Sequence, residues 1–108
     1  MQTIKTILLI FLLTLAPASL WAQQTDHYGI RKQAQKAFQD GNWKVAYQSY
    51  RKLCLEPTND PKMVGNDLLQ AWQCLRNLNR LNELDDFRED VIVKHFGNWR
   101  LLQAAARS

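Results

Sequence analysis

Apolar side chains recur at helical spacing along most of the chain from residue 28 onward. The spacing i, i+4, i+7, i+8 is typical of a helix with one buried face, and it occurs first at Ile30, Ala34, Ala37 and Phe38. Residues that break or terminate helices divide the pattern into five segments, at about 28–39, 42–56, 61–77, 81–95 and 99–107. No segment shows the alternation of a strand. The sequence therefore predicts an all-α fold of antiparallel helical hairpins.

Short polar residues, glycines and prolines predict where these helices begin and end. Thr25 or Asp26 can cap the first helix, and Gly41 suits the left-handed position after its end. Asp60 followed by Pro61 predicts the start of the third helix there, which Gly65 would weaken in its first turn. The apolar positions expected in the core of the middle helices are Trp43, Ala46, Tyr47, Tyr50, Leu53, Cys54, Val64, Leu68, Ala71, Trp72, Leu75, Leu81, Leu84, Phe87, Val91 and Ile92. The apolar side of the last helix is expected to carry Trp99, Leu102 and Ala106.

The segment 34–57 places small, glycine and aromatic residues in a defined order. They are Ala34, Gly41, Trp43, Ala46, Tyr50 and Leu53, followed by Pro57. This order and spacing resembles a tetratricopeptide repeat, although Pro57 comes one residue early. The resemblance implies a short solenoid of about two repeats plus a fifth helix, occupying residues 28–108.

A second, weaker copy of the repeat follows. If Asn79 takes the position of Gly41, Leu81 and Leu84 match the next two positions, but Arg88 stands where an aromatic residue is expected, and Phe87 is the candidate to fill that space. The segment 97–106 is also similar to helical leader regions of bacterial alpha-macroglobulin-like proteins.

The tetratricopeptide family lines a groove with the first helix of each hairpin, where extended peptides or helices bind. Carrying that register over implies a partner-binding groove of eight residues: Arg31, Gln35, Phe38, Gln39, Leu69, Gln73, Arg76 and Asn77. Arg31 and Arg76 would hold a ligand carboxylate through charge-assisted hydrogen bonds. The alternative is ordinary solvated surface, because two hairpins offer less than the ~800 Å² per partner of a standard interface.

The amino terminus has the layout of a secretory signal peptide. Lys5 precedes an apolar run at 7–15, and small residues follow before the polar residues begin. We expect cleavage after Ala22, with Ala18 as the competing site, followed by a short flexible lead at 23–27. An uncleaved membrane anchor is the alternative, but the run is shorter than the ~20 residues that span a bilayer. The sequence thus predicts export, to the periplasm or alternatively outside the cell.

Charge and residue types give no sign of catalysis. The net charge is +4 at pH 7, and no nucleic-acid-binding module accompanies it. The acidic residues around Asp85 and Asp86 suit a solvated helix face better than an active site. His27 and His95 stand outside any metal-binding spacing. We therefore expect no enzyme activity, no cofactor, no metal and no nucleic-acid partner.

Cys54 and Cys74 are the only cysteines. An exported chain with two cysteines allows a disulfide, and two buried free thiols are the alternative. We expect the two to lie near one another, since the second helix of one hairpin packs on the first of the next.

The sequence as a whole favours a non-catalytic module that binds a protein or peptide partner or a second copy of itself. The alternative is the amino-terminal helical part of a larger exported protein.

Overall fold

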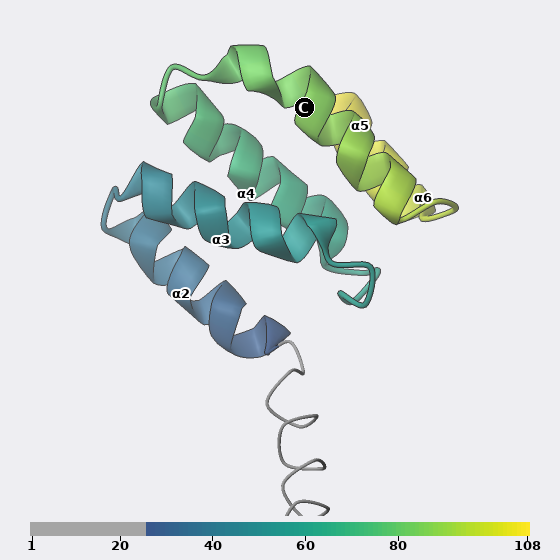
Figure 1. Cartoon of the computed structure of the whole chain (residues 1–108), viewed down its shortest axis with the longest axis horizontal. Helices are drawn as coiled ribbons and strands as arrows, with labels where there is room; N and C mark the ends of the chain where they lie inside the picture. Colours follow the sequence, from purple (N-terminus) through teal and green to yellow (C-terminus); the bar gives the residue numbers. More distant parts are fainter. Residues whose placement is uncertain (1–25) are drawn as a thin grey trace, which may run out of the picture.

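The computed structural model describes residues 26–108, which fold into α-helices joined by short connections, with no strand among them. The elements are α2 (His27–Gln39), α3 (Trp43–Leu55), α4 (Val64–Asn77), the 3-10 turn η1 (Leu81–Glu83), α5 (Leu84–Lys94) and α6 (Trp99–Arg107). Figure 1 shows α2, α3, α4 and α5 stacked side by side, with α6 behind α5. The all-α fold and its helical hairpins are as predicted.

The predicted leader, Met1–Ala22, and most of the predicted flexible lead lie outside the described residues. The last residue of that lead, His27, is already the first residue of α2. Over residues 26–108, none of the helices combines the length and the apolar composition that crossing a bilayer requires.

Three turns use the left-handed backbone conformation that ends a helix. Gly41 has a φ of 73° after α2, and Gly97 has a φ of 87° before α6. Asn79 has a φ of 57° after α4, and Asn is the residue that tolerates this region best after Gly. Asn79 therefore does in the second hairpin what Gly41 does in the first. At the other helix ends, the side chains of Asp26 and Asn98 cap α2 and α6.

Two helix starts differ from the prediction. The third helix begins at Val64 and not at Pro61, because Asp60 is used in a tight turn: its carbonyl accepts from the amides of Met63 and Val64, at 2.9 and 3.3 Å. Its side chain also accepts from the amide of Lys62, at 3.0 Å. The fourth helix opens with the 3-10 turn, which leaves Leu81 47% exposed instead of buried.

Small residues bring α2 and α3 together, and aromatic rings fill the space beside them. Ala34 and Ala46 are completely buried. Phe38 packs edge-on against Trp43 and Tyr50, with ring centroids 5.0 and 6.4 Å apart. In the second hairpin, where Arg88 replaces the aromatic residue, Phe87 is buried and packs against Tyr47 of α3, at 5.8 Å. Phe87 thus fills the space as anticipated.

The last helix buries a different side from the one expected. α6 packs on α4 through Leu101, Ala104 and Ala105, whereas Trp99 and Leu102 are 56% and 51% exposed. The reason is Gly65 of α4. A Cβ atom there would lie 3.0 Å from the Cβ of Ala104 and 3.2 Å from the carbonyl oxygen of Arg100. Gly65 is therefore a contact point that only small residues of α6 can approach, and not merely a weak point in α4.

Candidate functional site

A buried polar network ties α2 to the connection between α3 and α4. The Arg31 guanidinium donates to both carboxylate oxygens of Asp67, at 3.1 and 2.7 Å, and to the Asn59 side-chain oxygen, at 3.0 Å. The Asn59 amide in turn donates to Asp67 and to the carbonyl oxygen of Leu53, both at 3.0 Å. The side chain of Asp67 is completely buried and that of Arg31 is 14% exposed. The hydrogen bond to Asp67 raises the pKa of Arg31 above its ordinary value.

This network corrects the role expected of Arg31. We predicted that Arg31 would hold the carboxylate of a ligand, but the carboxylate in contact with it belongs to Asp67 of the same chain. Asp67 and Asn59 were not predicted. A signal for Asp67 was present, because it lies three residues after Val64 and four before Ala71, on the buried side of the helix. An acid at such a position requires a partner.

Part of the predicted groove is found between α2, α3 and α4. Gln35, Phe38 and Gln39 line a pocket of about 340 Å³ together with Tyr50, Asn66 and Gln70. Gln73, Arg76 and Asn77 lie further along α4, in its last turns, where the Asn77 amide donates to the carbonyl oxygen of Gln73 at 2.9 Å. The structure therefore brings the α2 residues together with the middle of α4, and not with its end.

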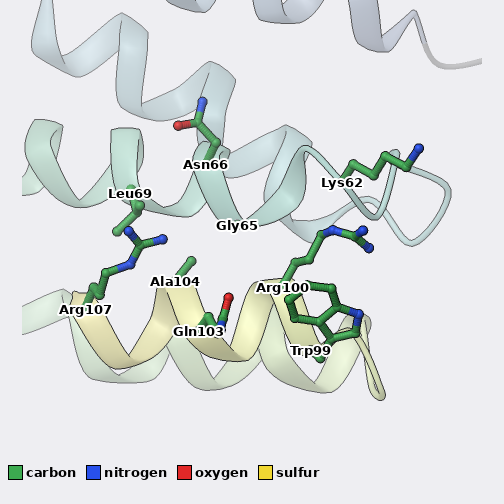
Figure 2. Close-up of a pocket in the computed structure, with 9 residues that line it drawn as sticks. All are labelled: Lys62, Gly65, Asn66, Leu69, Trp99, Arg100, Gln103, Ala104 and Arg107. Carbon is green, nitrogen blue, oxygen red and sulfur yellow. The ribbon is translucent and has the colours of Figure 1, made fainter.

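A second pocket, of about 330 Å³, lies between α4 and α6 (Figure 2). Its lining includes the predicted Leu69, and also Lys62, Gly65, Asn66, Trp99, Arg100, Gln103, Ala104 and Arg107. Asn66 lines both pockets, so they adjoin at this residue, and we call the two together the α2–α4–α6 face. Its α6 half was missed because the register that the family implies was carried only as far as the second hairpin.

The charged side chains that line the α4–α6 pocket are all positive. Three of its lining residues, Lys62, Arg100 and Arg107, are cationic, and none is acidic. Within the part of the chain that the structure describes, none of the three is in an ion pair. Figure 2 shows Arg100 and Arg107 reaching from α6 toward α4 at the two ends of the pocket. Arg100 also stacks over the ring of Trp99, at 4.4 Å.

These residues are suited to binding. Free guanidinium and ammonium groups recognise carboxylate or phosphate, and a half-exposed Trp offers a flat apolar contact. The side-chain amides of Asn66 and Gln103 can pair with the backbone of an extended segment. For residues 26–108, no cluster of three His, Cys, Asp or Glu side chains has the geometry to hold a metal.

The two cysteines are buried and their thiols are free. Asn59 bonds to both Leu53 and Asp67, so the end of α3, with Cys54, lies beside Asp67. Cys74 lies on α4, seven residues after Asp67, in the same buried core as Cys54. The packing of α3 on α4, from which we expected the two cysteines to lie near one another, is found, and the thiols are not joined in a disulfide.

Burial also determines the chemistry of the two thiols. It raises the pKa of Cys54 well above its ordinary value and that of Cys74 to about 11. Both groups stay protonated at neutral pH, whereas a nucleophilic cysteine has a lowered pKa. His95 contacts the carbonyl oxygen of Cys54, at 2.8 Å, and His27 contacts the hydroxyl of Thr58, at 3.4 Å.

Comparison with known proteins returned no match: no protein-family model fits the chain, and neither a curated protein nor a solved structure is similar to it.

Proposed function

We propose that this chain is an exported, non-catalytic helical-repeat module that binds an acidic protein segment on its α2–α4–α6 face. The single observation that carries the proposal is the α4–α6 pocket, where three cations and a half-exposed Trp99 gather without an acid. Bringing like charges together costs free energy unless an anion is present to neutralise them. Carboxylates of a partner would neutralise these cations and so favour binding at the α4–α6 pocket.

The partner chemistry follows from the length and composition of the face. Arg100 and Arg107 stand at the two ends of the pocket, so one segment can pair an acid with each. An apolar side chain between those acids would contact Leu69 or Trp99. Beyond Asn66 the face continues to Gln35 and Gln39 of α2, whose amides suit a peptide backbone. An extended segment with alternating acidic and apolar residues fits this arrangement.

The tetratricopeptide resemblance supports a module of this kind. The left-handed Asn79 lies at the position that the resemblance assigns to the turn, and small residues let α2 and α3 approach closely, as is typical of the family. We propose that α2 and α4 are the first helices of two repeats and that α6 caps the second. The secretory leader expected from the sequence places the module and its partner outside the cytoplasm.

The test is a titration with a fluorescent peptide of alternating Glu and Leu, followed by anisotropy. We expect binding that weakens with salt, because exposed charges are screened. The double variant Arg100→Gln/Arg107→Gln should weaken it at least tenfold, since each charged hydrogen bond contributes about 1.5–3 kcal/mol. The matched control is Lys44→Gln/Lys52→Gln, which removes two exposed charges from α3.

Binding to the control variant should remain within about twofold of the unmodified chain, on the scale of a surface charge. A peptide in which Lys replaces Glu should not bind. Equal losses in the two double variants would show that only net charge matters, and would reject the pocket as the site.

A further inference from the structure

Three large apolar side chains are exposed at and beside the connection between α5 and α6. Phe96 is 95% exposed, Val93 is 72% exposed and Trp99 is 56% exposed. They lie within residues 93–100 together with Lys94 and Arg100, and we call these five residues the α5–α6 tip. The left-handed Gly97 turns the chain at its centre, with no atom within 4 Å of the position a Cβ would take.

Charge is distributed unevenly around the tip. The last acid in the sequence is Asp90, one helical turn before Val93, and from there to Ser108 the only charged side chains are cationic. Lys94 and Arg100 are exposed on either side of Phe96, and Arg107 lies further along α6. Lys94 and Arg100 thus flank Phe96 in the sequence, while the acids nearest to Val93 are Glu89 and Asp90, one turn before it on α5.

The size of the tip indicates what kind of surface covers it. An aromatic side chain can bury about 150–250 Å², so Phe96 and Trp99 together offer roughly 230–380 Å² at their observed exposures. This is well below the ~800 Å² per partner of a standard protein interface. It is sufficient for an interfacial anchor, where a few aromatic residues enter the headgroup region and nearby cations meet anionic lipid.

We infer that the α5–α6 tip docks on an anionic lipid surface. Phe96 and Val93 enter the interface, Trp99 lies at headgroup level, and Lys94 and Arg100 pair with lipid phosphate. This contact is peripheral and spans nothing. It shares Trp99 and Arg100 with the α4–α6 pocket, whereas Val93, Lys94 and Phe96 belong to the tip alone. Arg107, at the far end of that pocket, has no part in the lipid contact.

The experiment measures co-sedimentation with vesicles. The chain is purified from the exported fraction, and its amino-terminal mass is determined, because an apolar leader would itself bind lipid. Vesicles of equal parts phosphatidylcholine and phosphatidylglycerol should bind the protein, and vesicles of phosphatidylcholine alone should bind it much more weakly. Phe96→Ala should lower partitioning at least tenfold, from the apolar area lost, and Lys94→Gln about fivefold.

Matched controls come from α3. Val45 is 44% exposed, and Lys44 beside it is exposed too. Val45→Ala and Lys44→Gln repeat the two kinds of change away from the tip and should leave partitioning within twofold. Because Phe96 is almost fully exposed, its replacement does not disturb the core, and circular dichroism melting curves should coincide for all four variants.

A site-specific measurement separates the tip from every other lipid contact. In ¹⁵N-labelled protein, the amide signals of residues 93–100 should shift or broaden with anionic bicelles and stay in place with neutral ones. Unchanged tip signals, or equal losses in the α3 controls, would overturn the inference. Tip signals that depend on protein concentration without lipid would assign this surface to a second copy of the chain and would overturn it as well.

Discussion

Removing Arg31 should destabilise the fold more than removing any exposed charge. In the Arg31→Ala variant, Asp67 loses two hydrogen bonds and the one cation paired with it among residues 26–108, and it remains completely buried. A buried charge left without its partner costs about 3–5 kcal/mol. Since Asn59 still donates to Asp67 at 3.0 Å, we expect the lower end of that range, about 3 kcal/mol. Domains of this size have only about 5–15 kcal/mol of stability.

The pair should also behave asymmetrically. Asp67→Ala should cost less than Arg31→Ala, because the guanidinium lies near the surface, at 14% exposure, and can turn into water. The double variant Arg31→Met/Asp67→Leu should recover part of the loss, since replacing a buried ion pair by apolar residues is often close to neutral. Recovery is incomplete because the buried side-chain oxygen of Asn59 loses its donor, Arg31. The fold would then keep its packing without any buried charge.

Urea denaturation followed by circular dichroism measures these effects. With a slope of about 1–2 kcal/mol per M for a small domain, a loss of about 3 kcal/mol lowers the midpoint by roughly 2 M. The control is Lys36→Ala, which breaks the exposed pair with Asp40 and should cost less than about 1 kcal/mol. If Arg31→Ala cost no more than Lys36→Ala, or if the double variant were less stable than both single ones, the reasoning would be refuted.

Two further predictions concern other buried positions. Gly65→Ala should destabilise the fold by about 1–2 kcal/mol, because overpacking against Ala104 outweighs the gain in helix propensity. Amide hydrogen exchange in α6 should accelerate in this variant. The control variant Asn66→Ala, at the neighbouring exposed position, should leave the exchange unchanged. Cys54 and Cys74 should resist alkylation in the folded protein and both react in urea. Since burial raises the pKa of both thiols, stability should be fully present below about pH 9 and fall as the pH rises toward 11. A Cys74→Ala variant should show a shallower fall, and a single reactive thiol in urea would contradict this account.

Much of the fold could be predicted from local patterns. The bounds of α3 and α6 were expected to within a residue or two, because Gly41, Gly97 and Asn98 act on their own backbone or their nearest neighbours. The errors occur where a distant contact decides the outcome. Leu81 was expected in the core by its helical spacing, but it lies in a 3-10 turn and stays half exposed.

The candidate site was only partly predictable for the same reason. Gln35 and Leu69 do line pockets, at the spacing that the tetratricopeptide register implies for a groove. Arg31 shares that spacing, but its long side chain reaches Asp67, which is 36 residues away in the sequence. Whether a cation is free for a ligand depends on such a partner. Arg100 and Arg107 of the α4–α6 pocket, which are in no ion pair within residues 26–108, were not singled out.

The sequence by itself determined the class of fold, because apolar periodicity and helix-terminating residues act over a few positions. Only the tertiary structure decided which face of each helix is covered. Gly65 admits Ala104 and leaves no room for a larger residue, so Trp99 turns outward to the pocket and the tip. The contact with Asp67, which is 36 residues away in the sequence, likewise decides that Arg31 is paired within the chain. Packing between distant residues, which no local pattern encodes, makes both decisions.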